Sequence, residues 1–126
     1  DFVEFGLPYF KELYSVDLPV KFFHNDAECA KSIKYYAEMG VLLYNPGIFD
    51  TLQQLRDMSG NRLAILGNIP PRDVLAKGTP DDVRQAVRQL LTTTPDKTRL
   101  ILSCAGGMPP GVTTENIRAF IEAAGS

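Results

Sequence analysis

Short apolar runs alternate along the chain with segments in which apolar residues recur at helical spacing. Each run is rich in β-branched, leucine or aromatic residues and is bounded by turn-forming residues. The middle runs are apolar almost throughout, which is typical of parallel strands covered on both faces. We expect strands at residues 18–24, 41–45, 63–68 and 99–104.

The intervening segments predict helices, and their ends carry capping signals. The expected helices cover residues 27–39, 49–58, 80–91 and 114–124, after a first helix at about residues 3–16. Thr79, Pro80 and Asp82 combine an N-cap, a proline at the first helical position and an acid in the first turn. Asp26 and Thr113 are further N-cap candidates.

The order of strands and helices predicts an α/β fold, either an open doubly wound sheet or part of a (β/α)8 barrel. In both folds the functional groups gather beyond the carboxyl ends of the parallel strands. Those ends read His24-Asn25-Asp26, Tyr44-Asn45, Gly67-Asn68 and Ser103-Cys104. We therefore expect one shared site at this edge of the sheet.

Length and composition add few constraints. The 126 residues suit one domain, with 44% apolar residues, 22% charged residues and a net charge of −2. No basic excess favours a nucleic-acid or membrane-surface partner, and no apolar run approaches the roughly 18 residues that span a bilayer. The start resembles no signal peptide, and free Cys29 and Cys104 suit a reducing compartment, so we expect a cytoplasmic protein.

Three motifs in the second half of the chain match a known family. They are Gly67-Asn68 with Pro71, Gly78-Thr79-Pro80 with Val83, and Gly107-Met108-Pro109-Pro110 with Glu115-Asn116. In order and spacing they resemble the C-terminal part of the uroporphyrinogen decarboxylase superfamily, strongly over about residues 60–124 and loosely elsewhere. The resemblance implies the C-terminal half of a TIM (β/α)8 barrel, made of four parallel strands alternating with helices, with residues 1–126 forming a single half-barrel portion.

Such a half-barrel has two open sheet edges and an apolar face without cover. We therefore expect the chain to be a C-terminal fragment that self-associates or pairs with the N-terminal half of the barrel. The complete protein is then the enzyme, and this chain alone is inactive.

One branch of the superfamily consists of corrinoid-dependent methyltransferases, and the resemblance of this chain to that branch implies a zinc site. These enzymes bind zinc through a His-x-Cys at the end of the fifth strand and a later cysteine in a glycine-rich turn, and the metal activates a thiolate, typically of coenzyme M, for attack on a methyl-corrinoid. His24 matches the histidine, Asp26 stands where the first cysteine would be, and Gly106 stands at the later cysteine, two residues after Cys104. The partner implied is a small-molecule or corrinoid-protein substrate.

The other branch, the true decarboxylases, needs no cofactor and acts on a tetrapyrrole in porphyrin biosynthesis. Its last strand commonly ends in Gly-His-Gly, where this chain reads Ala105-Gly106-Gly107. The histidine is missing, so we favour the zinc-dependent methyltransferase and keep the uroporphyrinogen decarboxylase as the alternative. A catalytically silent, self-associating fragment is the third possibility.

The chemistry of the rim residues leaves several roles open. His24 and Asp26 are two positions apart, so they share a face if the strand continues, and imidazole with carboxylate is an acceptable zinc pair that Cys104 could complete. Alternatively Asp26 caps a helix and His24 hydrogen-bonds within a turn, or both contact a substrate without metal. We take His24 and Asp26 as the candidate catalytic residues and His24, Asp26 and Cys104 as the candidate zinc ligands.

Five further residues are candidates for substrate binding. They are Tyr44, Asn45, Asn68, Gly106 and Gly107. The two glycines could let a ligand approach the backbone closely, or could only serve the connection from strand to helix. The asparagines could contact substrate or brace their turns.

Overall fold

The apolar runs form one sheet of four parallel strands in the order β1-β2-β3-β4. In the computed structural model, which describes residues 1–126, the strands are β1 (Phe22–Asn25), β2 (Leu43–Pro46), β3 (Ala64–Ile69) and β4 (Leu100–Cys104). Parallel pairing at every step confirms the predicted sheet. Strand β1 begins at Phe22 and is shorter than the strand predicted at residues 18–24.

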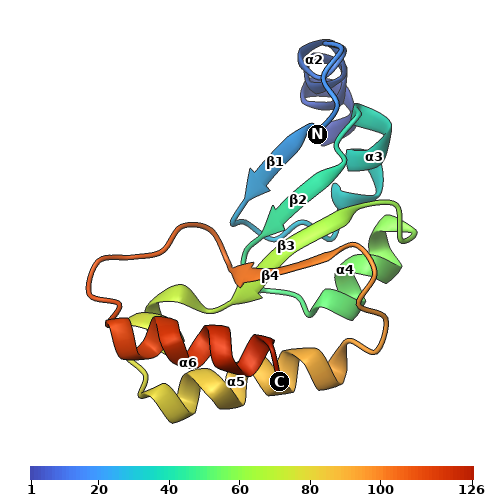
Figure 1. Ribbon diagram of the computed structural model, residues 1–126. Coiled ribbons are helices and arrows are strands. Elements are labelled where there is room, and N and C mark those ends of the chain that lie inside the picture. The colour runs from blue at the N-terminus through green and yellow to red at the C-terminus, as the bar shows by residue number, and fades with distance from the viewer.

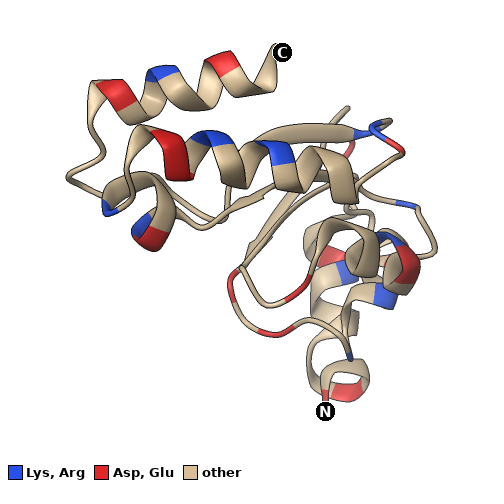
Figure 2. Cartoon of the chain, turned by 90° about the horizontal axis from the view of Figure 1, so that it is seen from below, with Lys and Arg blue, Asp and Glu red and all other residues tan.

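Helices connect the strands and cover one side of the sheet (Figure 1). They are α1 (Phe2–Phe5), α2 (Leu7–Leu13), η1 (Ile33–Tyr35), α3 (Tyr36–Met39), α4 (Leu52–Ser59), the π-helix η2 (Pro71–Ala76), α5 (Pro80–Thr93) and α6 (Thr114–Ala124). The last two pack side by side, and Figure 2 shows both signs of charge along them. No helix is both long enough and apolar enough to span a membrane.

Two of the three predicted N-cap residues, Thr79 and Thr113, are confirmed, and Asp26 is not. Thr79 and Thr113 accept hydrogen bonds from the backbone N–H of Asp82 and Asn116, as expected of N-caps. The prediction of a helix from residue 27, capped by Asp26, is wrong. The backbone N–H of Ala27 instead donates to Asn25 Oδ1 at 3.0 Å, and the chain makes a turn around buried Cys29 before η1 begins.

The helix-facing side of the sheet holds the hydrophobic core. Near β1 and β2 the rings of Phe23, Tyr36 and Tyr44 pack together, with centroids 4.8 to 6.1 Å apart. Near β3 and β4 a second cluster includes Ile69 and Cys104. Burial of apolar surface on this side of the sheet therefore stabilises the fold.

The opposite side of the sheet, here called the inner face, carries no helix. Strand register aligns Phe22 with Leu43 on this face, and His24 with Asn45, while Leu66 aligns with Ile101. Phe22 and Ile101 are about half exposed, at 48% and 51%. Four parallel strands with helices on one side and an apolar inner face constitute half of a (β/α)8 barrel, as predicted.

Candidate active site

His24 lies near the carboxyl end of β1, on the inner face, with a fixed ring orientation. Its Nδ1 lies 3.2 Å from the backbone oxygen of Asn45 on the neighbouring strand. Because a carbonyl oxygen can only accept a hydrogen bond, Nδ1 must carry the hydrogen. The lone pair of the neutral ring is therefore on Nε2.

Asp26 lies directly beyond His24 and presents its carboxylate to that lone pair. The distance from His24 Nε2 to Asp26 Oδ2 is 3.3 Å, and both side chains are partly open to solvent. A carboxylate oxygen and an unprotonated imidazole nitrogen are both acceptors, so this approach is favourable only when a proton or a metal cation lies between them. The pair is thus a site for a proton or a metal cation.

Gly106, in the turn after β4, closes over this pair. Its φ of +64° is in the left-handed region, and a Cβ built there would lie 3.2 and 3.3 Å from the two carboxylate oxygens of Asp26 and 3.4 Å from His24 Cε1. Glycine therefore allows the backbone to approach the carboxylate closely. Gly107 is exposed, and no atom lies within 4 Å of its hypothetical Cβ.

The side chain of Asn45 holds the turn after β4 in this position. Its side chain is 4% exposed, and its Oδ1 accepts a hydrogen bond of 3.1 Å from the backbone N–H of Gly106. Its Nδ2 donates to the backbone oxygens of Leu66 and Cys104. Asn45 therefore links β2, β3 and β4, and its contacts are those of a bracing residue.

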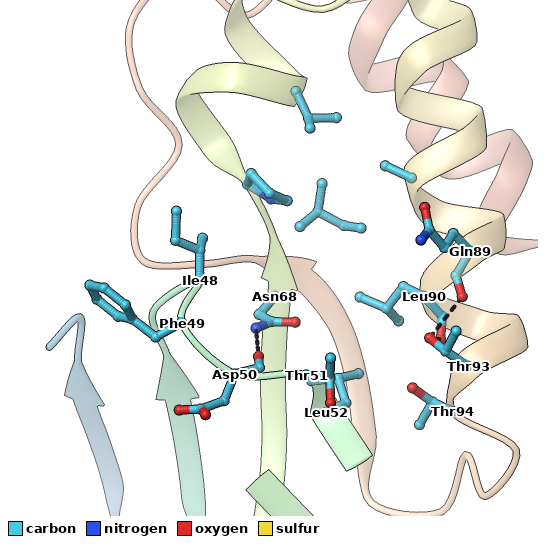
Figure 3. Close-up of a pocket in the computed structure, with 14 residues that line it drawn as sticks. Ile48, Phe49, Asp50, Thr51, Leu52, Asn68, Gln89, Leu90, Thr93 and Thr94 are labelled. Atoms are coloured by element: carbon cyan, nitrogen blue, oxygen red, sulfur yellow. Dashed lines mark hydrogen bonds between the residues drawn. The ribbon is translucent and has the colours of Figure 1, made fainter. Parts of the chain in front are cut away.

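Asn68, at the end of β3, braces a second loop. Its Nδ2 donates to the backbone oxygen of Gly47 at 3.0 Å and to that of Asp50 at 2.9 Å, and Figure 3 shows the bond to Asp50. These bonds hold the loop between β2 and α4 against the end of β3. Of the two roles left open by the sequence, the geometry of Asn68 fits bracing.

Tyr44 lies in the core and not at the rim. It is fully buried among Phe23 and Tyr36, and burial raises the pKa of its phenol well above the ordinary value. Its side chain points to the helix-facing side because neighbouring residues of a strand alternate between faces. The predicted contact between Tyr44 and a substrate has no support in this position.

Cys104 is likewise not brought to His24 and Asp26. Its side chain is 8% exposed and belongs to the apolar cluster between β4 and the helices, and its Sγ lies 3.4 Å from the backbone oxygen of Gly106. No group of three His, Cys, Asp or Glu side chains is arranged to hold a metal ion. The chain therefore assembles two of the three predicted zinc ligands.

A pocket of about 300 Å³ opens at the rim beside Asp26. Its lining comes from the loop after β2, from the start of η2 and from the turn after β4, and includes Gly47, Ile48, Phe49, Pro70, Pro71, Arg72, Asp73 and Ala105. Arg72 and Asp73 were not identified from the sequence, although their place shortly after the end of β3 is the signal that could have indicated them. This pocket brings Arg72 and Asp73 into one lining with Asp26, the partner of His24.

A larger pocket, of about 400 Å³, lies on the helix-facing side (Figure 3). It is lined by the loop after β2, the end of β3 and helix α5, and Asp50 is its one ionisable lining residue. Asp26 lines the smaller pocket and not the larger one, and His24 contacts Asp26, so we place the candidate active site at the smaller pocket at the rim.

Three comparisons with known proteins agree with this architecture. The family model described as uroporphyrinogen decarboxylase (URO-D) matches residues 1–126. A methylated-thiol--coenzyme M methyltransferase from Methanosarcina mazei is 28% identical over 122 residues, which are 95% of this chain and 31% of that protein. A solved methyltransferase structure from Methanosarcina mazei superposes with a TM-score of 0.83 at 17% identity, over 98% of this chain and 36% of that one.

The chain spans about a third of each of these two methyltransferases, at 31% and 36% of their lengths. The likeness to the solved structure concerns the fold, and the family match extends over every residue of the chain. The chain belongs to the uroporphyrinogen decarboxylase (URO-D) family.

Proposed function

We propose that the protein containing this chain transfers a methyl group to a small thiol, at a zinc ion held by His24 and Asp26. The observation that carries the proposal is the approach of His24 Nε2 to Asp26 Oδ2, 3.3 Å apart at the carboxyl edge of the sheet. The methyltransferase relative, which is named for a methylated thiol and coenzyme M, supports the choice of thiol methyl transfer.

The donor set suits zinc in type and is incomplete in number. Imidazole nitrogen and carboxylate oxygen are both ordinary zinc ligands, and catalytic zinc sites usually have three protein ligands and one open position. His24 and Asp26 would supply two ligands, and the thiol substrate would supply another. When bound, zinc stabilises the thiolate form of a coordinated thiol at neutral pH.

The residues of the chain position the metal ligands and the reacting sulfur. The carbonyl oxygen of Asn45 fixes the His24 ring, so that Nε2 faces the site. The Asn45 side chain holds the Gly106 turn against Asp26, which limits access from that side. As methyl donor we propose a methyl-corrinoid on a partner protein: the sulfur takes the methyl group, and the corrinoid keeps the bonding electron pair.

The remainder of the protein would complete both the site and the fold. The inner face exposes Phe22 and Ile101, and we propose that the N-terminal half of the same barrel covers them. A second copy of this chain is the alternative cover. The two unpaired cysteines, Cys29 and Cys104, fit the cytoplasm that we propose as its location.

An assay of the full-length protein tests the proposal. Purified protein with zinc should convert methylcobalamin and 2-mercaptoethanesulfonate into the methyl thioether, and His24→Ala should reduce the rate by at least about 100-fold, as loss of a metal ligand does. Asp73→Asn is the matched control for Asp26→Asn, because both carboxylates line the rim pocket and only Asp26 contacts His24.

The same preparation of full-length protein distinguishes the methyl-transfer proposal from the decarboxylase alternative. Zinc-independent release of carbon dioxide from uroporphyrinogen, without methyl transfer, would contradict the proposal and favour that alternative. Unchanged methyl transfer in both His24→Ala and Asp26→Asn would also contradict it, because the reaction would then occur elsewhere.

A further inference from the structure

The lining of the rim pocket includes one member of the His24–Asp26 pair, the carboxylate of Asp26, and a guanidinium group. Asp26 lines one part of the pocket, and Arg72 lines the part formed by η2. The lining also includes the loop residues Ile48 and Phe49, which are 54% and 61% exposed. The pocket therefore offers an acidic part at the metal-binding pair, an apolar wall and a cationic part.

Arg72 is exposed, and its guanidinium forms none of the ion pairs found in the chain. Arg56 pairs with Asp96, and Arg84 pairs with Asp81 and Glu122. Arg88, Arg99 and Arg118 form no ion pair either, but unlike Arg72 they do not line the rim pocket. Nor does the guanidinium of Arg72 donate a hydrogen bond within the chain, unlike that of Arg62, which donates to backbone oxygens. All its donors are available to a ligand in the pocket.

The acids near Arg72 leave this part of the pocket with a net positive charge. Asp73 is the neighbouring acid, and its Oδ1 lies 3.6 Å from Lys77 Nζ, which is one helical turn away. Arg72 and Lys77 against Asp73 amount to one excess positive charge. Asp26, in the other part of the pocket, faces His24 and is the proposed ligand of a cation.

We propose that Arg72 binds the anionic group of the thiol substrate, while the sulfur of that substrate lies at His24 and Asp26. A guanidinium presents its donors as a planar fork that matches a sulfonate, carboxylate or phosphate. This assignment rests on the proposed function, and it makes Arg72 a residue that determines specificity.

Pairs of ligands that differ in one group provide the test. Dissociation constants for the zinc-loaded full-length protein are measured by NMR titration with 2-mercaptoethanesulfonate, with 2-mercaptoethanol, which lacks the anion, and with ethanesulfonate, which lacks the thiol. Arg72→Gln should weaken binding of both sulfonates about tenfold or more, as expected for loss of a charge-assisted hydrogen bond, and leave 2-mercaptoethanol unchanged. Arg72→Lys should restore part of the affinity.

A matched control is Arg118→Gln, which removes an exposed arginine on α6 that lies outside the rim pocket. This variant should bind all the ligands as the parent protein does. Equal weakening of charged and neutral thiols by Arg72→Gln, or no weakening at all, would overturn the assignment, as would a parent protein that binds no sulfonate. If ethanesulfonate binds through Arg72 while no thiol binds in the presence of zinc, the anion site stands and the proposed thiol chemistry fails.

Discussion

The two faces of the sheet differ in how they are stabilised. On the helix-facing side, Ile65 is 1% exposed and packs in a continuous apolar cluster. On the inner face the neighbouring strand carries Ile101, which is 51% exposed, and the buried contacts near the rim are the hydrogen bonds of Asn45. One side of the half-barrel is therefore a finished core, and the other is an interface with a polar site at its edge.

This difference separates the residues that maintain the fold from those available for chemistry. Side chains that point toward the helices, such as Tyr44 and Cys104, are removed from solvent even when they lie at strand ends. His24 points to the inner face and remains accessible, whereas Asn45 beside it is buried and bonds to the turn after β4. For this fold, the face on which a strand-end residue lies matters as much as its position along the strand.

The largest expected effect is on stability, in a pair of identical substitutions on the two faces. Ile65→Ala should lower the free energy of unfolding of the chain by about 2–5 kcal/mol, because it creates a cavity in a packed core. Ile101→Ala should cost less than about 1 kcal/mol, because its side chain is half exposed. Urea denaturation measures both.

The full-length protein sharpens this comparison. If the N-terminal half covers the inner face, Ile101→Ala should there cost about as much as a buried isoleucine, roughly 2 kcal/mol or more. Equal losses for Ile65→Ala and Ile101→Ala in the chain alone would contradict the distinction between the faces.

A smaller loss of stability is expected when the bracing amide is removed. Asn45→Ala deletes a buried side chain that bonds to the backbone of three residues, Leu66, Cys104 and Gly106, and should cost about 2–3 kcal/mol. The ring of His24 should keep its tautomer, because its acceptor is the backbone oxygen of Asn45. Nitrogen chemical shifts of His24 report the tautomer, and a changed tautomer would show that the side chain has another role.

Glycine substitutions in the turn after β4 separate strain from steric contact. Gly106→Ala adds a Cβ at 3.2 Å from the Asp26 carboxylate and forces an alanine to a φ of +64°, so it should lower stability by about 1–2 kcal/mol and weaken metal binding. Gly111→Ala has a φ of +92° without a neighbour within 4 Å, and Gly107→Ala has neither problem. If Gly111→Ala weakens metal binding as much as Gly106→Ala does, contact with Asp26 is not the cause.

The smallest effect is a pH dependence in the helix layer. Hydrogen bonds from the backbone N–H and the hydroxyl of Thr79 lower the pKa of Asp82 below its ordinary value of 3.8. A lowered pKa in the folded state means that the stabilisation is complete above pH 3.8 and disappears as the pH falls through the folded-state pKa. Asp82→Asn should thus be less stable than the parent at pH 6, and the two unfolding curves should converge once the pH falls below the folded-state pKa of Asp82. A difference independent of pH would exclude this carboxylate as its source.

Much of the fold could be predicted from sequence because its signals are local. The apolar runs at residues 41–45, 63–68 and 99–104 coincide with β2, β3 and β4 to within two residues. Helix α5 follows from Thr79 and Pro80, which cap and start it. The segment at residues 27–32 was misassigned because the Asn25 side chain forms a local turn that competes with the helix.

The candidate site was harder to predict from the sequence than the fold, because it depends on which way each side chain points. Residues two apart on one strand share a face, and this rule placed His24 and Asp26 together. The rule could not orient Cys104, whose direction follows from the register of β4 with β3, where it aligns with buried Ile69. The close approach of Gly106 to Asp26 depends on contacts between residues 80 positions apart, which no local pattern encodes.

The most direct test of the account is the zinc content of the purified full-length protein, measured by elemental analysis for the parent, His24→Ala and the control Asp73→Asn. We predict about one zinc per chain in the parent and in Asp73→Asn, and near-complete loss in His24→Ala, because the imidazole is one of the two zinc ligands that we propose for this chain. A parent protein without zinc after equilibration with the metal, or a His24→Ala variant that retains it fully, would contradict the central claim.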